Sequence, residues 1–240
     1  MIRCLVSVLL LAPPVLSSAQ RSNQLWLDYQ LDYPFANQYL FEVVASYQTV
    51  LDGQKWRNYN MSPTFEYQFF RRMDLIGTMP INYTLQKEGA NTLGLDPALG
   101  ARFHITQNKR IDSRLILKTE HRFFYQIEDK DWESSTRLRL KAEALIAING
   151  PNLFADRLWH AILDYEEFFV MDQQVNERFA NRRRARLGVG YRLDYKNRFE
   201  LIYTRQSTRD EIDGDFTSDD NIIQLRYKMY LNPNKNTTTP

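Results

Sequence analysis

The chain is poor in cysteine, glycine and proline, and it has no long apolar run after its first twenty residues. Cys4 is the only cysteine of the 240 residues, and it lies in a segment that we expect to be cleaved. The mature chain therefore offers no disulfide, thiol nucleophile or cysteine metal ligand. The mean hydropathy of −0.51, with no second apolar run, excludes a helical membrane protein. The mean hydropathy does not exclude a β-barrel, because barrel strands are only half apolar.

The N-terminus has the layout of a secretory signal. Arg3 supplies a positive start, residues 5–16 form an apolar stretch, and Ser17, Ser18 and Ala19 form a small-residue cleavage site. The apolar stretch contains two prolines and is too short to span a bilayer as a helix. We therefore predict three parts: a cleavable signal peptide over residues 1–19, an outer-membrane barrel over 20–231 and a polar tail over 232–240.

Long segments that alternate apolar and polar residues dominate the rest of the chain. Tyrosine and phenylalanine, at 14 each, add to this bias toward strands. No 3.6-residue stripe competes with the period of two, so we expect strands and no helices. Eleven such segments are present: residues 25–33, 39–47, 58–69, 73–85, 93–105, 114–123, 137–148, 159–166, 182–193, 199–203 and 223–231.

The links between these segments alternate between short and long. Short turns are expected near residues 34–37, 71–72, 107–109 and 194–197, and longer polar links over 52–55, 87–92, 128–133, 172–177 and 207–219. This asymmetry is typical of bacterial outer-membrane barrels, which also have an even number of strands. Because eleven is odd, we expect ten or twelve strands. Either the pattern does not reveal one strand, or two of the segments form a single strand, or the N-terminal segment runs differently.

Strand length separates a membrane barrel from a soluble β-domain, which alternates in the same way. Several segments run for about a dozen residues, whereas soluble strands cluster near about five or six. Aromatic residues lie near strand ends, where interfacial girdles would fall: Tyr33, Tyr39, Trp56, Phe69, Phe103, Tyr125, Trp132, Trp159 and Tyr191. We predict an all-β, antiparallel, up-and-down transmembrane β-barrel of about 10–12 strands in the bacterial outer membrane.

The polar faces of four segments are dense in charge, and we expect them to line the lumen. A selective pore or a site for an anionic ligand is one interpretation, and a set of salt bridges that fills a narrow lumen is the favoured one. The residues of this lumen charge network are Arg114, Lys118, Glu120, Arg122, Arg137, Arg139, Lys141, Glu143, Asp164, Glu166, Arg182, Arg184, Arg186 and Arg192.

Three other patterns do not indicate a functional site once they are placed on strands. The run of arginines over 182–186 resembles a nucleic-acid patch, but alternation sends Arg183 alone to the outer face, where lipopolysaccharide phosphate is a candidate contact. Gly188 and Gly190 lie within a strand, where close packing against lumen arginines explains them better than a phosphate loop. The histidines at 104, 121 and 160 lie on separate strands without a metal or serine motif, so we expect no catalytic residue, metal site or cofactor.

The chain resembles a family of uncharacterised outer-membrane barrels of Gram-negative bacteria, a domain-of-unknown-function class. The similar features are Trp26 soon after the signal and the segments 119–123, 181–193 and 222–227, within a resemblance that covers residues 24–231. It implies an outer-membrane barrel and brings no established activity or functional residue.

We expect a narrow channel or a structural or surface scaffold without enzymatic activity. A membrane-embedded lipid-modifying enzyme and a soluble periplasmic ligand-binding barrel are the alternatives. The expected partners are the lipid bilayer, lipopolysaccharide and the outer-membrane assembly machinery. A nucleic-acid partner is not expected, because the net charge is only +2. We expect the barrel to be a monomer.

Overall fold

The computed structural model describes residues 22–51, 53, 56–87, 89–171, 181–209 and 218–231. The predicted signal peptide, the polar tail, the link at 172–177 and much of the link at 207–219 lie outside these residues. The described part is built of strands: β1 Ser22–Phe35, β2 Tyr39–Val50, β3 Trp56–Phe70, β4 Met73–Thr78, β5 Ile81–Gln86, β6 Thr92–Leu95, β7 Ala98–Gln107, β8 Ile111–Gln126, β9 Asp131–Ala147, β10 Leu158–Val170, β11 Asn181–Arg192, β12 Asn197–Arg209 and β13 Ser218–Tyr230. None of these residues forms a helix able to span a membrane.

Two of the wall-spanning segments are each broken into two strands. β4 pairs with the second half of β3, and β5 pairs with the first half. β4 and β5 therefore act as one full-length strand of the barrel wall, here called a crossing, that is interrupted at Pro80. β6 and β7 make another crossing, interrupted at Pro97, and both pair with β8. Proline has no N–H to donate to the ladder, which explains the breaks. The thirteen strands therefore form eleven crossings.

The barrel closes through a parallel pair. β1 pairs with β13 in a parallel register from Ser22 opposite Asp220 to Asp32 opposite Tyr230, and all other pairs are antiparallel. The prediction of an all-β barrel is confirmed, and the eleven segments correspond to its eleven crossings. Our expectation of ten or twelve strands was wrong, because parallel neighbours also satisfy their backbone hydrogen bonds and let an odd number close.

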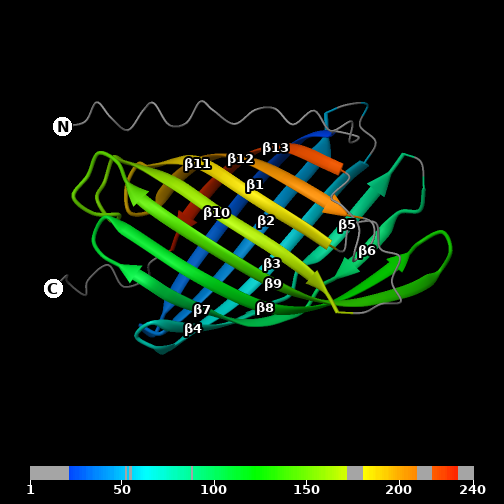
Figure 1. Cartoon of the computed structure of the whole chain (residues 1–240), viewed down its shortest axis with the longest axis horizontal. Helices are drawn as coiled ribbons and strands as arrows, with labels where there is room; N and C mark the ends of the chain where they lie inside the picture. Colours follow the sequence, from blue (N-terminus) through cyan, green and yellow to red (C-terminus); the bar gives the residue numbers. More distant parts are fainter. Residues whose placement is uncertain are drawn as a thin grey trace.

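The two ends of the barrel differ in their connections (Figure 1). The turn end carries the links at 36–38, 71–72, 108–110, 148–157 and 193–196, and the β5–β6 and β8–β9 hairpins project at the loop end. The predicted asymmetry holds with two exceptions. The link 148–157 is long although it lies at the turn end, and 127–130 is short although it lies at the loop end. β1 starts at the loop end and β13 stops at the turn end.

The barrel buries polar side chains and exposes apolar ones, which is the reverse of a soluble protein. Polar side chains such as Gln24, Asp28 and Gln224 are buried in the lumen, whereas large apolar side chains such as Leu27 and Leu225 are exposed on the outer face. A soluble barrel or sandwich places its apolar face inward and exposes few contiguous apolar patches. The distribution is therefore typical of a membrane barrel and not of a soluble β-domain.

Aromatic side chains form rows on the outer face toward both ends. Near the turn end, Tyr29, Tyr227 and Phe199 are neighbours across three strands, with ring centroids 5.7 and 5.1 Å apart. Near the loop end, Tyr125 packs on Trp132 at 5.0 Å. These rows match the girdles of a transmembrane barrel. Trp56 was wrongly placed among them, because it shares the inward face of β3 with polar Asn58.

Candidate functional site

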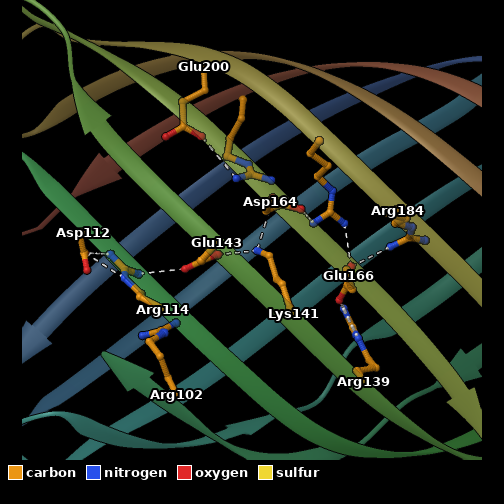
Figure 2. A network of polar contacts seen from close by, with 12 residues as sticks. Arg102, Asp112, Arg114, Arg139, Lys141, Glu143, Asp164, Glu166, Arg184 and Glu200 are labelled. Carbon is orange, nitrogen blue, oxygen red and sulfur yellow. Dashed lines mark hydrogen bonds and ion pairs between the residues drawn. The ribbon is translucent and has the colours of Figure 1, made fainter. Parts of the chain in front are cut away.

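The charged residues of β8–β11 form one continuous ion-pair chain along the inner wall (Figure 2). It runs along the wall through these residues in order: Asp112, Arg114, Glu143, Lys141, Asp164, Arg186, Glu166, Arg139, Glu120 and Arg137. Alternation places every second side chain of each strand on this face, and the antiparallel register sets acids beside bases. The chain thus joins four strands by charge as well as by backbone hydrogen bonds.

Glu166 is the most heavily bonded member of this chain. Its side chain is 2% exposed, and its carboxylate oxygens lie 2.6 Å from Arg139 and 2.9 Å from Arg186, with Arg184 at 3.7 Å. A buried carboxylate is tolerated only when it is paired and hydrogen-bonded. Three guanidinium groups around one carboxylate meet that condition and hold β9, β10 and β11 in register.

An aromatic–guanidinium cluster occupies the lumen toward the loop end. The buried ring of Phe168 lies 4.7, 4.9 and 5.0 Å from the guanidinium carbons of Arg137, Arg139 and Arg184, and Arg184 also lies 5.5 Å from the ring of Trp26. Such contacts are favourable cation–π interactions. We had not predicted this cluster, since a single phenylalanine on a polar face gives no periodic signal.

A chamber of about 670 Å³ occupies the lumen toward the turn end. The β1–β2 turn lines it at one side, and Asp164, Lys141 and Arg186 of the ion-pair chain line it where the chamber meets the aromatic–guanidinium cluster. Its other lining groups are mostly charged. The lumen therefore holds a chamber in its turn-end half and the aromatic–guanidinium cluster in its loop-end half.

The charges of the lumen are segregated between two walls. Strands β1–β6 contain one basic residue, Arg57, which is exposed on the outer face. The inward carboxylates of this acidic wall are Asp28, Asp32, Glu42, Glu66, Asp74 and, at the break after β6, Asp96. Strands β7–β13 carry fourteen inward Lys and Arg against seven inward Asp and Glu: Arg102, Arg114, Lys118, Arg122, Arg137, Arg139, Lys141, Arg182, Arg184, Arg186, Arg192, Arg198, Arg226 and Lys228 against Asp112, Glu120, Glu143, Asp164, Glu166, Glu200 and Asp220.

A few ion pairs bridge the boundaries between the walls. Arg102 of β7 binds Glu66 of β3 through two contacts at 2.5 and 2.7 Å. Arg226 of β13 lies 3.2 Å from Asp28 of β1 and 3.4 Å from Glu200. The lumen thus has a basic wall facing an acidic wall, joined at their edges.

All fourteen residues of the predicted lumen charge network lie on the inward register, and ten of them form parts of the ion pairs around Glu120, Glu143, Asp164 and Glu166. The remaining four are more separate. Arg122 is 3.8 Å from Asp96, and Arg192 donates to the backbone carbonyl of Leu153 at 3.4 Å. Lys118 has no carboxylate within 4.0 Å among the described residues, and Arg182 lies beyond Arg184 toward the loop end. The acidic wall and Arg198, Arg226 and Lys228 were missed, because the charges there are spread over many strands with few on each.

Gly190 and Gly188 provide room for large neighbours, as predicted, but the neighbours are not arginines. A Cβ on Gly190 would lie 2.2 Å from Nε2 of His160, and one on Gly188 would lie 2.9 Å from the side chain of Ile202. His160 is opposite Gly190 in the β10–β11 register, and its ring occupies the space that a Cβ on Gly190 would need. Glycine here is a packing requirement of the lumen.

The three histidines are held by different partners. His104 Nε2 is 2.8 Å from Asp74, His121 Nδ1 is 2.8 Å from the hydroxyl of Thr136, and His160 Nε2 is 3.7 Å from Glu200. No serine is hydrogen-bonded to a histidine in the described part of the chain. A search of the same residues finds no group of three or more His, Cys, Asp or Glu able to hold a metal ion.

The sequence matches the family described as a protein of unknown function (DUF2490) over residues 23–232. The chain belongs to this family. The predicted resemblance to an uncharacterised barrel family is thereby confirmed. Comparison with curated proteins gave no match. Among solved structures, this DUF2490 protein is similar to one titled "NanC porin structure in rhombohedral crystal form", with a TM-score of 0.50, 9% identity, and 80% of this chain and 86% of that chain covered. That likeness shows a porin-like barrel fold.

Proposed function

We propose that this protein is a monomeric integral barrel of the bacterial outer membrane that conducts small hydrophilic solutes through a narrow lumen. The apolar outer face between two aromatic rows supports membrane insertion, and the porin-like fold supports a channel. In this proposal the loop end faces the cell exterior. The partners in this proposal are the bilayer, the outer-membrane assembly machinery and, at the outward-facing Arg183, the phosphate of lipopolysaccharide.

The observation that carries the proposal is the charge segregation around the chamber. A basic wall opposite an acidic wall creates a field across the lumen that orients water and polar solutes. An apolar solute would have to displace that water without replacing its hydrogen bonds. Small polar solutes are therefore the class that such a lumen admits.

A second candidate function is a structural or surface scaffold with a closed lumen. The aromatic–guanidinium cluster favours it, because Phe168 and its three arginines project into the loop-end half of the lumen. A lipid-modifying enzyme has less support, since the porin-like fold and the histidine contacts offer no nucleophile with its base.

Planar-bilayer conductance of the purified, refolded barrel separates the two candidates. We expect discrete small conductance steps, and larger steps for Phe168→Ala, which removes the central ring of the cluster. Phe169→Ala is the matched control, because the neighbouring Phe169 is exposed on the outer face and should leave the steps unchanged.

A heat-modifiable, correctly folded wild-type protein that stays silent would overturn the channel and favour the scaffold. If Phe168→Ala conducts and the wild type does not, the cluster closes the lumen. Equal conductance changes in Phe168→Ala and Phe169→Ala would show that the cluster does not limit the pore.

A further inference from the structure

Three basic side chains form a row across β11, β12 and β13 at the turn end of the lumen. Arg192 is directly opposite Arg198 in the β11–β12 register, and Arg198 is directly opposite Lys228 in the β12–β13 register. Arg198 and Lys228 line the chamber, and Arg192 is 7% exposed. All three project to the same face, since register partners in a sheet share a face.

Within the described part of the chain, this row has no carboxylate partner at ion-pair distance, and Asp32, Glu42 and Glu200 act on Lys228 only from further away. Like charges directly opposite each other on neighbouring strands destabilise a sheet. In the described ranges, none of the three has a carboxylate oxygen within 4.0 Å, whereas Arg114, Arg139 and Arg186 of the same lumen are all ion-paired. The row therefore differs from the ion-pair chain, which neutralises itself.

The row also has unused hydrogen-bond donors. The Nε atoms of Arg192 and Arg198 are buried and have no hydrogen-bond partner. The guanidinium group of Arg198 also lies over the ring of Tyr230 at 4.8 Å. A buried N–H without an acceptor is unfavourable, so these donors are best satisfied by an acceptor that arrives from outside the chain.

We propose that Arg192, Arg198 and Lys228 form a binding site for a small oxyanion, the carboxylate or phosphate group of a solute in the chamber. The planar forks of the two arginines suit bidentate contact with such a group, and the lysine adds a point charge. The site needs only the folded barrel, but its consequence for transport, a preference for anionic solutes, rests on the proposed channel function.

Thermal unfolding of the refolded full-length barrel in detergent tests the site, with the heat-modifiable gel shift as the readout. Inorganic phosphate or acetate is titrated against chloride at constant ionic strength. We expect a saturable rise of the unfolding midpoint by about 3–6 °C at a tenfold excess over Kd. The double variant Arg192→Gln/Arg198→Gln should lose this rise. Arg57→Gln, a control on the outer face of β3, should keep it.

A second readout separates a binding site from a merely structural role. In chloride alone, the double variant should unfold close to the wild-type midpoint, because relief of repulsion within the row offsets the lost Arg192–Leu153 hydrogen bond and Arg198–Tyr230 contact. A midpoint that falls in chloride while the phosphate-dependent rise is unchanged would overturn the proposal. So would equal rises in wild type, the double variant and Arg57→Gln, which would indicate a general salt effect.

The two anions identify the chemistry, since a rise with phosphate alone assigns phosphate and a rise with acetate alone assigns carboxylate. The experiment also stands apart from the conductance measurement. A silent bilayer with an intact anion-dependent rise overturns only the channel. A conducting barrel without the rise overturns only this site.

Discussion

At the scale of single residues, the period of two decides which side chains enter the lumen, and charge decides which of them can stay there. Glu166 shows both effects, because it is almost fully buried yet surrounded by Arg139, Arg184 and Arg186. Neutralising the acid would leave three guanidinium groups facing one another in a confined space. Its contribution to stability therefore exceeds that of a single surface ion pair.

Glu166→Gln should lower the free energy of unfolding by about 3 kcal/mol. This value is at the lower end of the range for breaking a buried ion pair, because Arg139 and Arg186 keep some contact with water. Glu133→Gln is the control, since Glu133 is exposed and accepts one hydrogen bond from Gln126 at 2.6 Å, and it should cost under about 1 kcal/mol. Urea midpoints of the two refolded variants measure the difference. Equal midpoints would show that the ion-pair chain is not a source of stability.

The predicted residues and the missed ones differ in how their signal is spread along the chain. Arg137, Arg139 and Lys141 recur at every second position of one strand, so the sequence alone indicates a charged face. Asp28 and Glu66 lie on different strands, and only the closed barrel assembles such single carboxylates into an acidic wall. Alternation places Phe168 on the lumen face, but its role could not be predicted, because it depends on arginines contributed by two neighbouring strands.

At the scale of strands, the segments 73–85 and 93–105 were predicted as continuous, and each is broken once by proline. Backbone donors bridge the breaks, from Asp96 to Pro80 at 2.9 Å and from His121 to Pro97 at 2.9 Å. The wall therefore stays closed while its direction changes. Close strand packing next to these breaks depends on small residues such as Gly100 of β7.

Gly100→Ala should destabilise the barrel much more than Gly94→Ala, although both glycines flank the same break. A Cβ on Gly100 would lie 2.2 Å from the carbonyl oxygen of Leu117, a backbone atom that cannot swing aside. On Gly94 the nearest atom, Cβ of Asn82, would be 3.4 Å away, which is an ordinary contact. We expect a loss of about 1–3 kcal/mol for the first variant and little change for the second. Heat-modifiable mobility after refolding checks this order, and a reversed order would contradict the packing described.

At the scale of the whole molecule, the number of crossings follows from the direction of the first strand. An even number is the rule when both chain ends emerge at the same side of the barrel. Here β1 and β13 run in the same direction, so an eleventh crossing closes the wall. Alternation reveals eleven crossings but not the partner of the first strand, because a parallel and an antiparallel neighbour require the same pattern of side chains.

The parallel closure can be tested with paired cysteines, since the only natural cysteine is Cys4. Leu25 and Ile223 are register partners on the outer face, and neighbouring strands about 4.8 Å apart suit a disulfide. Leu25→Cys/Ile223→Cys should therefore form an intramolecular bond in the folded protein, seen as a faster-migrating band in a heated, non-reduced gel. Leu25→Cys/Met229→Cys should not, because six residues of strand separate Met229 from the partner of Leu25 by about 20 Å. Antiparallel pairing of β1 and β13 would bring Leu25 toward Met229 and reverse the result. A further strand between β1 and β13 would abolish both bonds, so the two variants together distinguish an eleven-crossing barrel from one with an even number.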